Sequence, residues 1–170
     1  LNTVYKAINE VKRLFIRVES DELTYPLHII LRFEIEKELI TGALSVEDLP
    51  RVWNEKMKEY LGIVPLTDNE GVLQDVHWSS GFFGYFPTYL LGQMCAAQIF
   101  HAAKTAIPEL EEKIGQGSFS ELKLWLNKNI HHYGSLLPLD DLLLKVTGER
   151  INPNYLINYL EQKYTDIYML

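Results

Sequence analysis

Apolar positions recur at helical spacing along most of this chain and predict a mainly helical protein. The clearest stripe lies between residues 21 and 40, where apolar side chains return every fourth position. Positions with this spacing share one face of a helix, so we expect the face to enter a core. Gly42 is expected to end the helix, because glycine readily adopts the left-handed conformation of a C-cap. The stripe comprises Leu23, Leu27, Leu31, Ile35 and Leu39, with Ile30 beside it.

Capping signals and interruptions of the apolar pattern define further elements. Ser45 with Asp48, and Ser118 with Glu121, resemble capping boxes at helix starts. The segment 63–84 is rich in glycine and is expected to be irregular, with one short strand over 71–76. The fold class is therefore all-α with at most a minor short β element, in a single helical domain over residues 1–170. The other predicted helices cover residues 1–14, 50–61, 86–106, 118–134 and 139–146, and a last one follows the Asn-Pro pair at 152–153.

Composition excludes several classes of protein. The net charge is −7, whereas binding to nucleic acid or to an anionic membrane surface requires a basic surface. No apolar run reaches the roughly 18 residues that span a bilayer. Cys95 is the only cysteine, so an internal disulfide is excluded and a reducing cytoplasm is the simplest compartment.

Polar and titratable residues gather beside aromatic residues in the segment 71–89. Gln74, Asp75 and His77 lie within four residues, and tyrosines follow shortly after. Such a mixture is typical of the wall of a cleft rather than of a plain core. His77 either donates to a developing oxyanion and moves a proton, or it is a structural histidine in a packed loop. Tyr85 is a better candidate than Tyr89 for a phenol that donates to an oxyanion, because glycines precede it and free its placement; an amphipathic wall residue is the alternative.

A second informative segment precedes the long helix. Arg17 lies before a helix entry that carries Glu19, Asp21 and Glu22. The acids suit a helix N-terminus. A guanidinium binds a carboxylate through two parallel hydrogen bonds, which is what recognition of a free peptide C-terminus requires. Alternatively, Arg17 pairs with Asp21 or Asp75 as part of the architecture.

Other histidines give no self-contained metal site. No two histidines are four residues apart, none is followed by glutamate, and no cysteine cluster exists. His28, Arg32 and Glu36 share a helix face with Tyr25, which we interpret as a solvated or salt-bridged surface. We therefore expect no metal ligand and no metal in this chain.

Two motifs resemble those of the carboxypeptidase Taq family of zinc-dependent metallocarboxypeptidases. Residues 16–21 read Ile-Arg-Val-Glu-Ser-Asp, and the family has Ile-Arg-x-x-Ala-Asp, so Ser20 replaces an alanine. Residues 71–78 match the family's Gly-x-x-Gln-Asp-x-His-Trp at every defined position. Further similar runs extend the resemblance over essentially the whole chain.

The resemblance implies a helix-rich, cytoplasmic, homodimeric peptidase that removes single residues from peptide C-termini. In this family a His-Glu-x-x-His motif and a later glutamate hold the zinc, which cobalt can replace, and the glutamate of the motif activates the zinc-bound water. This sequence contains no His-Glu-x-x-His. We therefore expect the chain to be the C-terminal, substrate-groove part of a larger zincin-like enzyme. Alone, it should be inactive, and its partners would be the N-terminal part, a second copy and peptides with a free C-terminal carboxylate.

The motif match also implies roles for individual residues. Arg17 would anchor the substrate or close the groove, and Asp21 of the same motif would contribute to substrate binding. His77 or Tyr85 would stabilise the tetrahedral intermediate, while the side chains of residues 74 and 75 position them. The alternative reading is a noncatalytic helical interaction module derived from this family, in which the same wall binds a partner.

Overall fold

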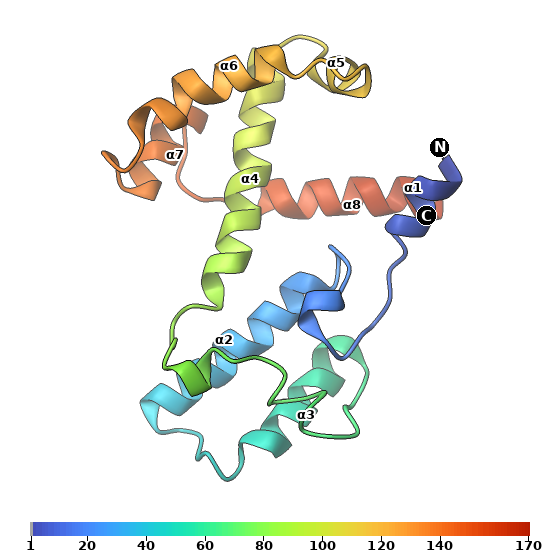
Figure 1. Ribbon diagram of the computed structural model, residues 1–170, viewed down its shortest axis with the longest axis vertical. Helices are drawn as coiled ribbons and strands as arrows, with labels where there is room; N and C mark the ends of the chain where they lie inside the picture. The colour runs from blue at the N-terminus through green and yellow to red at the C-terminus, as the bar shows by residue number, and fades with distance from the viewer. Residues whose placement is uncertain (1) are drawn as a thin grey trace. The chain divides into compact units, whose positions relative to one another are not determined.

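Every regular element in the part of the chain that the structure describes, residues 2–170, is a helix (Figure 1). This computed structural model confirms the all-α fold class. The short strand expected over 71–76 is wrong, because that segment is a succession of turns. The elements are α1 Asn2–Ile8, η1 Arg17–Glu19, α2 Tyr25–Thr41, α3 Leu49–Leu61, η2 Trp78–Ser80, α4 Pro87–Ala106, α5 Leu110–Gly115, α6 Ser120–Asn129, η3 His131–Tyr133, α7 Leu139–Thr147 and α8 Asn154–Tyr168.

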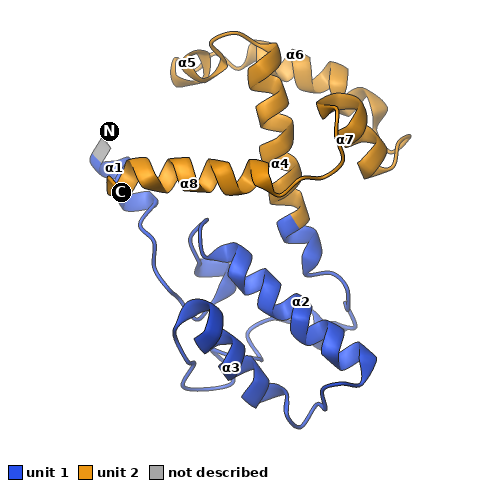
Figure 2. Ribbon diagram, turned by 180° about the vertical axis from the view of Figure 1, so that it is seen from behind, with its two compact units in different colours: residues 1–90 blue, residues 91–170 orange. Residues whose placement is uncertain are grey.

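The chain divides into two compact units, residues 1–90 and residues 91–170, and the division falls inside α4 (Figure 2). Each unit has its own cluster of buried apolar side chains. The single domain expected from the sequence stays a prediction.

The core of the first unit forms where α2 packs against α3. Leu31 and Ile35 of the predicted stripe are fully buried there. Leu23, by contrast, is 36% exposed, because α2 begins only at Tyr25 and the residues before it form a turn. The buried members are Leu31, Ile35, Leu44, Trp53, Met57 and Leu61. Burying each such side chain contributes about 1.5–3 kcal/mol.

The ends of the helices follow the capping signals in some places and not in others. Gly42 has φ +73° and ends α2 as predicted. The predicted helix over 1–14 is too long, since α1 ends at Ile8. The capping box of Ser118 and Glu121 is also wrong: α6 begins at Ser120, and the Glu121 carboxylate pairs with Lys113 instead. A charged partner outside the helix has drawn this carboxylate away from the backbone.

The polar face of α2 departs most from expectation. His28 and Arg32 are fully buried and Glu36 is 2% exposed, so this face is not solvated; of the two alternatives, Arg32 follows the salt-bridged one through its ion pair with Asp75. Segments from either side of the helix in sequence cover this face. Gln74 and Gly84 of the glycine-rich segment bond directly to the side chains of Arg32 and Glu36. Arg32 and Glu36 can be buried because each of these charged side chains has hydrogen-bond partners inside the unit.

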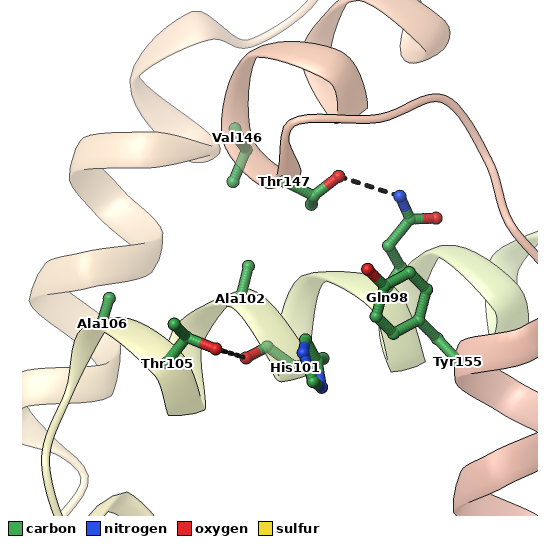
Figure 3. Close-up of a pocket in the computed structure, with 8 residues that line it drawn as sticks. All are labelled: Gln98, His101, Ala102, Thr105, Ala106, Val146, Thr147 and Tyr155. Carbon is green, nitrogen blue, oxygen red and sulfur yellow. Dashed lines mark hydrogen bonds between the residues drawn. The ribbon is translucent and has the colours of Figure 1, made fainter.

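In the second unit, a buried glutamine attaches the α7–α8 connection to α4. Gln98 donates through Nε2 to the Thr147 hydroxyl at 2.8 Å (Figure 3). The same nitrogen donates to the carbonyls of Glu149 at 3.3 Å and Arg150 at 3.1 Å. Its Oε1 accepts the N–H of Asn152 at 3.0 Å. One side chain thereby satisfies backbone groups of a connection that has no helix of its own. Ala103, Ile107 and Leu110 form the apolar cluster of this unit.

Among the helices of residues 2–170, none combines the length and the apolar character needed to cross a membrane.

We predict that Gln98→Leu destabilises the protein by about 1–3 kcal/mol, because the substitution leaves buried backbone groups without partners. Gln162→Leu, on the exposed side of α8, is the matched control and should change stability by less than about 0.5 kcal/mol. Urea unfolding of both variants measures the difference. Equal effects would contradict the role given to Gln98.

Candidate functional site

Turns between residues 67 and 73 bring the two polar residues that follow, Gln74 and Asp75, against α2. The N–H of Leu73 donates to the carbonyl of Asp68 at 2.8 Å, and that of Gly71 donates to the carbonyl of Thr67 at 3.1 Å. Gly71 lies close to Trp53: an added Cβ would be 3.5 Å from the Trp53 ring and 3.4 Å from the Thr67 carbonyl oxygen. The glycine thus allows the loop to approach the core, and Gln74 and Asp75 follow directly.

Asp75 lies between two buried arginines. Its Oδ1 accepts from Nη2 of Arg17 at 2.7 Å, and its Oδ2 accepts from Nε of Arg32 at 2.7 Å. Burial alone would raise the pKa of the Asp75 carboxyl, but the hydrogen bonds and charges of the two arginines outweigh burial and hold this pKa below its usual value. Asp75 therefore carries its negative charge inside the unit.

Each nitrogen of the Arg17 guanidinium has a hydrogen-bond partner. Besides Nη2, its Nε donates to Asp75 Oδ1 at 3.1 Å and its Nη1 donates to the Tyr25 hydroxyl at 3.0 Å. Arg17 is only 6% exposed. Burial lowers the pKa of Arg17, yet the hydrogen bond and charge of Asp75 outweigh it and raise the pKa. Of the two architectural partners considered from sequence, the structure pairs Arg17 with Asp75.

Arg32 is a member of this cluster that sequence reasoning did not assign to the site. Its Nη1 donates to the carbonyl of His28 at 2.7 Å and its Nη2 donates to Gln74 Oε1 at 2.8 Å. Burial lowers the pKa of Arg32 to about 10, against the opposing effect of Asp75. The helical spacing of residues 28, 32 and 36 was the available signal, and it was assigned to the surface.

Gln74 connects the Arg17 segment with α2. Its Oε1 accepts from the backbone N–H of Arg17 and from Arg32, both at 2.8 Å. Its Nε2 donates to the carbonyls of Phe15 at 3.0 Å and Glu70 at 2.9 Å. All four bonds fix the loop, so Gln74 acts on the site by positioning.

Asp21 does not join this cluster. Its Oδ1 accepts the N–H groups of Leu23 and Thr24, and its Oδ2 accepts the Lys12 N–H at 2.9 Å and the Thr24 hydroxyl at 2.9 Å. Both oxygens are thus engaged by the turn that leads into α2. Asp21 orders the segment that carries Arg17.

His77 lies in an aromatic layer beside Asp75. Its ring centroid is 4.2 Å from that of Phe86 and 5.7 Å from that of Tyr85. Nε2 is 3.0 Å from the Tyr89 hydroxyl oxygen, while Nδ1 is 3.9 Å from Asp75 Oδ1 and has no hydrogen-bond partner. Tyr85 is 46% exposed, so it is the open member of this layer.

Glu36 anchors the segment that carries the aromatic residues, a role that the sequence did not reveal. Its Oε1 accepts the Trp78 Nε1–H at 3.2 Å and the Gly84 N–H at 2.6 Å. The Trp78 ring also packs edge-to-face against Trp53, with centroids 6.2 Å apart. One buried carboxylate therefore sets the path of residues 78–84 across α2.

His28 is buried directly behind the arginines. Burial lowers the pKa of His28 from 6.5 to about 4, and the positive charges of Arg32 and Arg17 add to this shift. His28 is therefore neutral near pH 7. A second cation at this position would be repelled by the arginines.

The described residues do not fit a metal centre. Across residues 2–170, no group of three or more His, Cys, Asp or Glu side chains is arranged to hold a metal ion. His131 instead bonds to Asn127 Oδ1 through Nδ1 at 2.8 Å, and the ring of His101 packs against that of Tyr155. We therefore derive no chemical step through a metal from these side chains.

The second unit holds an open pocket of about 330 Å³ formed by α4, α7 and the start of α8 (Figure 3). His101, Thr105 and Tyr155 face it. None of the site residues predicted from sequence lies there. The cluster around Asp75 belongs wholly to the first unit.

The fold is similar to that of solved carboxypeptidase structures. The chain is similar to metallocarboxypeptidase 1 of Trypanosoma cruzi, with a TM-score of 0.92 and 46% identity over 95% of this chain and 34% of that one. It is also similar to the M32 carboxypeptidase of Deinococcus radiodurans R1, with a TM-score of 0.94 and 37% identity over 98% of this chain and 34% of that one. The chain therefore shares its helical architecture with about a third of each of these carboxypeptidases.

Sequence comparison gives the family. Residues 1–164 match the carboxypeptidase Taq (M32) metallopeptidase family, and the chain belongs to it. Carboxypeptidase 1 of Bacillus subtilis (strain 168) is 51% identical over 100% of this chain and 34% of its own length. Thermostable carboxypeptidase 1 of Pyrococcus furiosus is 42% identical over 95% of this chain and 32% of its own length. The chain spans about a third of the length of the curated relatives it matches.

We predict that Asp75→Asn destabilises the protein by about 3–5 kcal/mol, because it leaves two buried guanidinium groups without a counter-charge. Asp68→Asn, at an exposed position in the same unit, should cost less than about 0.5 kcal/mol. Urea unfolding followed by tryptophan fluorescence compares the two variants. A loss below about 1 kcal/mol for Asp75→Asn would contradict the assignment of Asp75 as the bridge.

His28 should make stability depend on pH. Because its pKa is lowered to about 4 in the folded state, the unfolded chain binds the proton more tightly. The folded protein is unaffected above pH 6.5 and loses stability as the pH falls from 6.5 towards 4, by about 2 kcal/mol between pH 7 and pH 5. His28→Gln should remove this slope, whereas His101→Gln, at an exposed position, should retain it. Unfolding free energies at both pH values test this, and an unchanged slope in His28→Gln would refute it.

Proposed function

We propose that this chain supplies the C-terminal, substrate-groove part of a metallocarboxypeptidase that removes single residues from peptide C-termini. The observation that carries the proposal is the Arg17–Asp75–Arg32 cluster beside His77. Both family motifs meet in it, although 58 residues separate Arg17 from Asp75 in the chain. Similarity to metallocarboxypeptidases along nearly the whole chain supports it.

The metal ligands of such an enzyme would come from outside this sequence. A bound metal supplies Lewis acidity and an activated water in peptidases of this kind. The residues of this chain bind the peptide, orient it and stabilise charge on its reacting carbonyl. Zinc is the metal we propose for the larger enzyme.

Arg17 would attract the free carboxylate of the peptide. The cluster contains two guanidinium groups, Arg17 and Arg32, against the single carboxylate of Asp75, which leaves one positive charge in excess. A buried excess charge draws an anion more strongly than an exposed one, because water screens it less. Since the guanidinium already has partners at every nitrogen, Arg17 contributes mainly through its charge and by closing the end of the groove. Asp21 contributes by ordering the segment that carries Arg17.

His77 or Tyr85 would stabilise the tetrahedral intermediate, while Gln74 and Asp75 hold the loop that presents His77. Donors aimed at a developing oxyanion each contribute about a hundredfold to a thousandfold in rate. Tyr85 is exposed and adjoins the His77 ring, so a peptide can reach its hydroxyl.

Exposed apolar side chains of the first unit suit the proposed assembly. Leu66 is 88% exposed, Val76 70% and Phe82 58%. We propose that the remaining part of the enzyme and a second copy of the chain cover such surface in a cytoplasmic homodimer.

The second candidate function is a noncatalytic helical interaction module. The observation that favours it is that every nitrogen of the Arg17 guanidinium, and both polar atoms of the Gln74 side chain, have intramolecular hydrogen-bond partners, which is consistent with a purely structural cluster. In that case the exposed aromatic residues of the loop 82–85 would bind a partner protein rather than a substrate.

The test is peptidase activity with and without the family's zinc motif. The 170-residue chain, given zinc or cobalt and an N-blocked peptide, should bind no stoichiometric metal and release no C-terminal residue. A longer polypeptide that carries His-Glu-x-x-His before this chain should release it. There, His77→Ala and Tyr85→Phe should each lower kcat about a hundredfold with little change in KM.

His101→Ala, in the second unit, is the control and should leave kcat unchanged. A longer polypeptide without carboxypeptidase activity would favour the interaction module. Unchanged kcat in both site variants would remove His77 and Tyr85 from the mechanism.

A further inference from the structure

Tyr89 is the polar partner of His77, whereas Tyr85 was the phenol that the sequence favoured as the oxyanion donor. The Tyr89 hydroxyl oxygen lies 3.0 Å from Nε2 of His77, at hydrogen-bond distance. Tyr85 contacts the His77 ring only through its own ring, with centroids 5.7 Å apart at an interplanar angle of 41°. The two tyrosines also touch each other edge-to-face, with centroids 5.5 Å apart.

The environment of the other ring nitrogen decides which atom carries the proton in the His77–Tyr89 bond. Nδ1 of His77 is buried and faces Asp75 Oδ1 at 3.9 Å. Asp75 is ionised, because Arg17 and Arg32 hold its pKa low. A lone pair on Nδ1 would be repelled by this carboxylate, whereas an N–H at Nδ1 is attracted to it. A neutral imidazole carries one N–H only, so Nε2 is then the acceptor.

The relative acidity of the two possible donors also favours a hydrogen bond from the Tyr89 hydroxyl to Nε2 of His77. A phenol titrates near pH 10, whereas the N–H of a neutral imidazole is a far weaker acid, so the phenol is the better donor to a nitrogen lone pair. Arg17 adds to this preference. Its Cζ lies 5.0 Å from the centroid of the Tyr89 ring, where its positive charge polarises the phenol. The Tyr89 hydroxyl therefore donates to Nε2 of His77.

In this arrangement neither nitrogen of His77 is free to meet a substrate. Nδ1 has no access to solvent, and Nε2 is occupied by the hydroxyl. The Tyr89 oxygen, in contrast, keeps its lone pairs. Phe86 packs on the imidazole ring at 4.2 Å between centroids and fixes its plane.

We propose that His77 acts through Tyr89: Asp75 orients the Nδ1–H of His77, Nε2 accepts the Tyr89 hydroxyl, and that hydroxyl is the end of the chain that contacts the peptide. The last clause rests on the proposed function, whereas the hydrogen-bond order does not. Tyr89 is thereby a further catalytic residue, and His77 becomes its positioning residue.

The hydrogen-bond order is tested by nitrogen-15 NMR of the 170-residue chain labelled at histidine, with His77→Gln to assign the signal. We expect His77 to be protonated at Nδ1 and bare at Nε2. Tyr89→Phe keeps the ring over Arg17 and removes only the donor, so the His77 signals should shift towards a mixture of the two tautomers. Tyr85→Phe should leave the tautomer of His77 unchanged.

Two NMR outcomes would overturn the proposal. One is an Nε2-protonated His77 in the unsubstituted chain, and the other is an unchanged His77 spectrum in Tyr89→Phe. The remaining histidines serve as internal references, because a variant that has lost its fold shifts them all. This arm needs no peptidase activity, so it gives its answer even where the proposed function fails.

The catalytic role is tested in the longer polypeptide that carries the zinc motif. Tyr89→Phe should lower kcat about a hundredfold and leave KM within about twofold, and Tyr89→Leu should lose no more in kcat. Retention of kcat in Tyr89→Phe, with loss only in Tyr89→Leu, would assign the residue to packing and overturn the catalytic role. Tyr60→Phe removes a hydroxyl that bonds to Glu34 away from this cluster and should leave kcat unchanged.

Discussion

The first unit is organised around one constraint, the sharing of the Asp75 carboxylate by two buried arginines. Neither Arg17 nor Arg32 could be buried alone, since a desolvated guanidinium without a counter-charge costs several kcal/mol. Each oxygen of Asp75 accepts one short hydrogen bond of 2.7 Å from an arginine. Gln74 also connects the two arginines, because its Oε1 accepts from the backbone N–H of Arg17 and from the side chain of Arg32. Three distant segments of the chain are thereby brought together.

A buried ion cluster of this kind contributes little net stability, because desolvation offsets most of the attraction. Its main effect is to fix the positions of the segments around it. The ion pairs of Asp75 fix the loop that bears His77, and the Glu36 carboxylate fixes the aromatic residues that follow. The result is a wall in which an imidazole and two phenols occupy set positions. Oxyanion stabilisation depends on such preorganised donors, so the architecture suits the proposed chemistry.

Each unit contains buried polar side chains that hold a loop, but these side chains are neutral in one unit and charged in the other. In the second unit, Gln98 satisfies a loop of backbone groups with one neutral side chain. In the first unit the buried groups are charged, and His28 behind them has a lowered pKa. Charge is concentrated where the two family motifs meet. This difference supports assigning the substrate-side role to the first unit and a supporting role to the second.

The sequence by itself determined the helical class, the stripe of Leu31 and Ile35, and the glycine that ends α2, because periodicity and capping are local properties. It also determined which residues form the motifs, including Arg17, Asp75 and His77. Only the tertiary structure decided that Arg32 and Glu36 lie inside, and that Tyr89 rather than Tyr85 bonds to His77. The spacing of polar residues on a helix face is the same whether water or another segment of the chain covers that face. Its burial depends on partners 42 and 48 residues away, and local spacing carries no information about them.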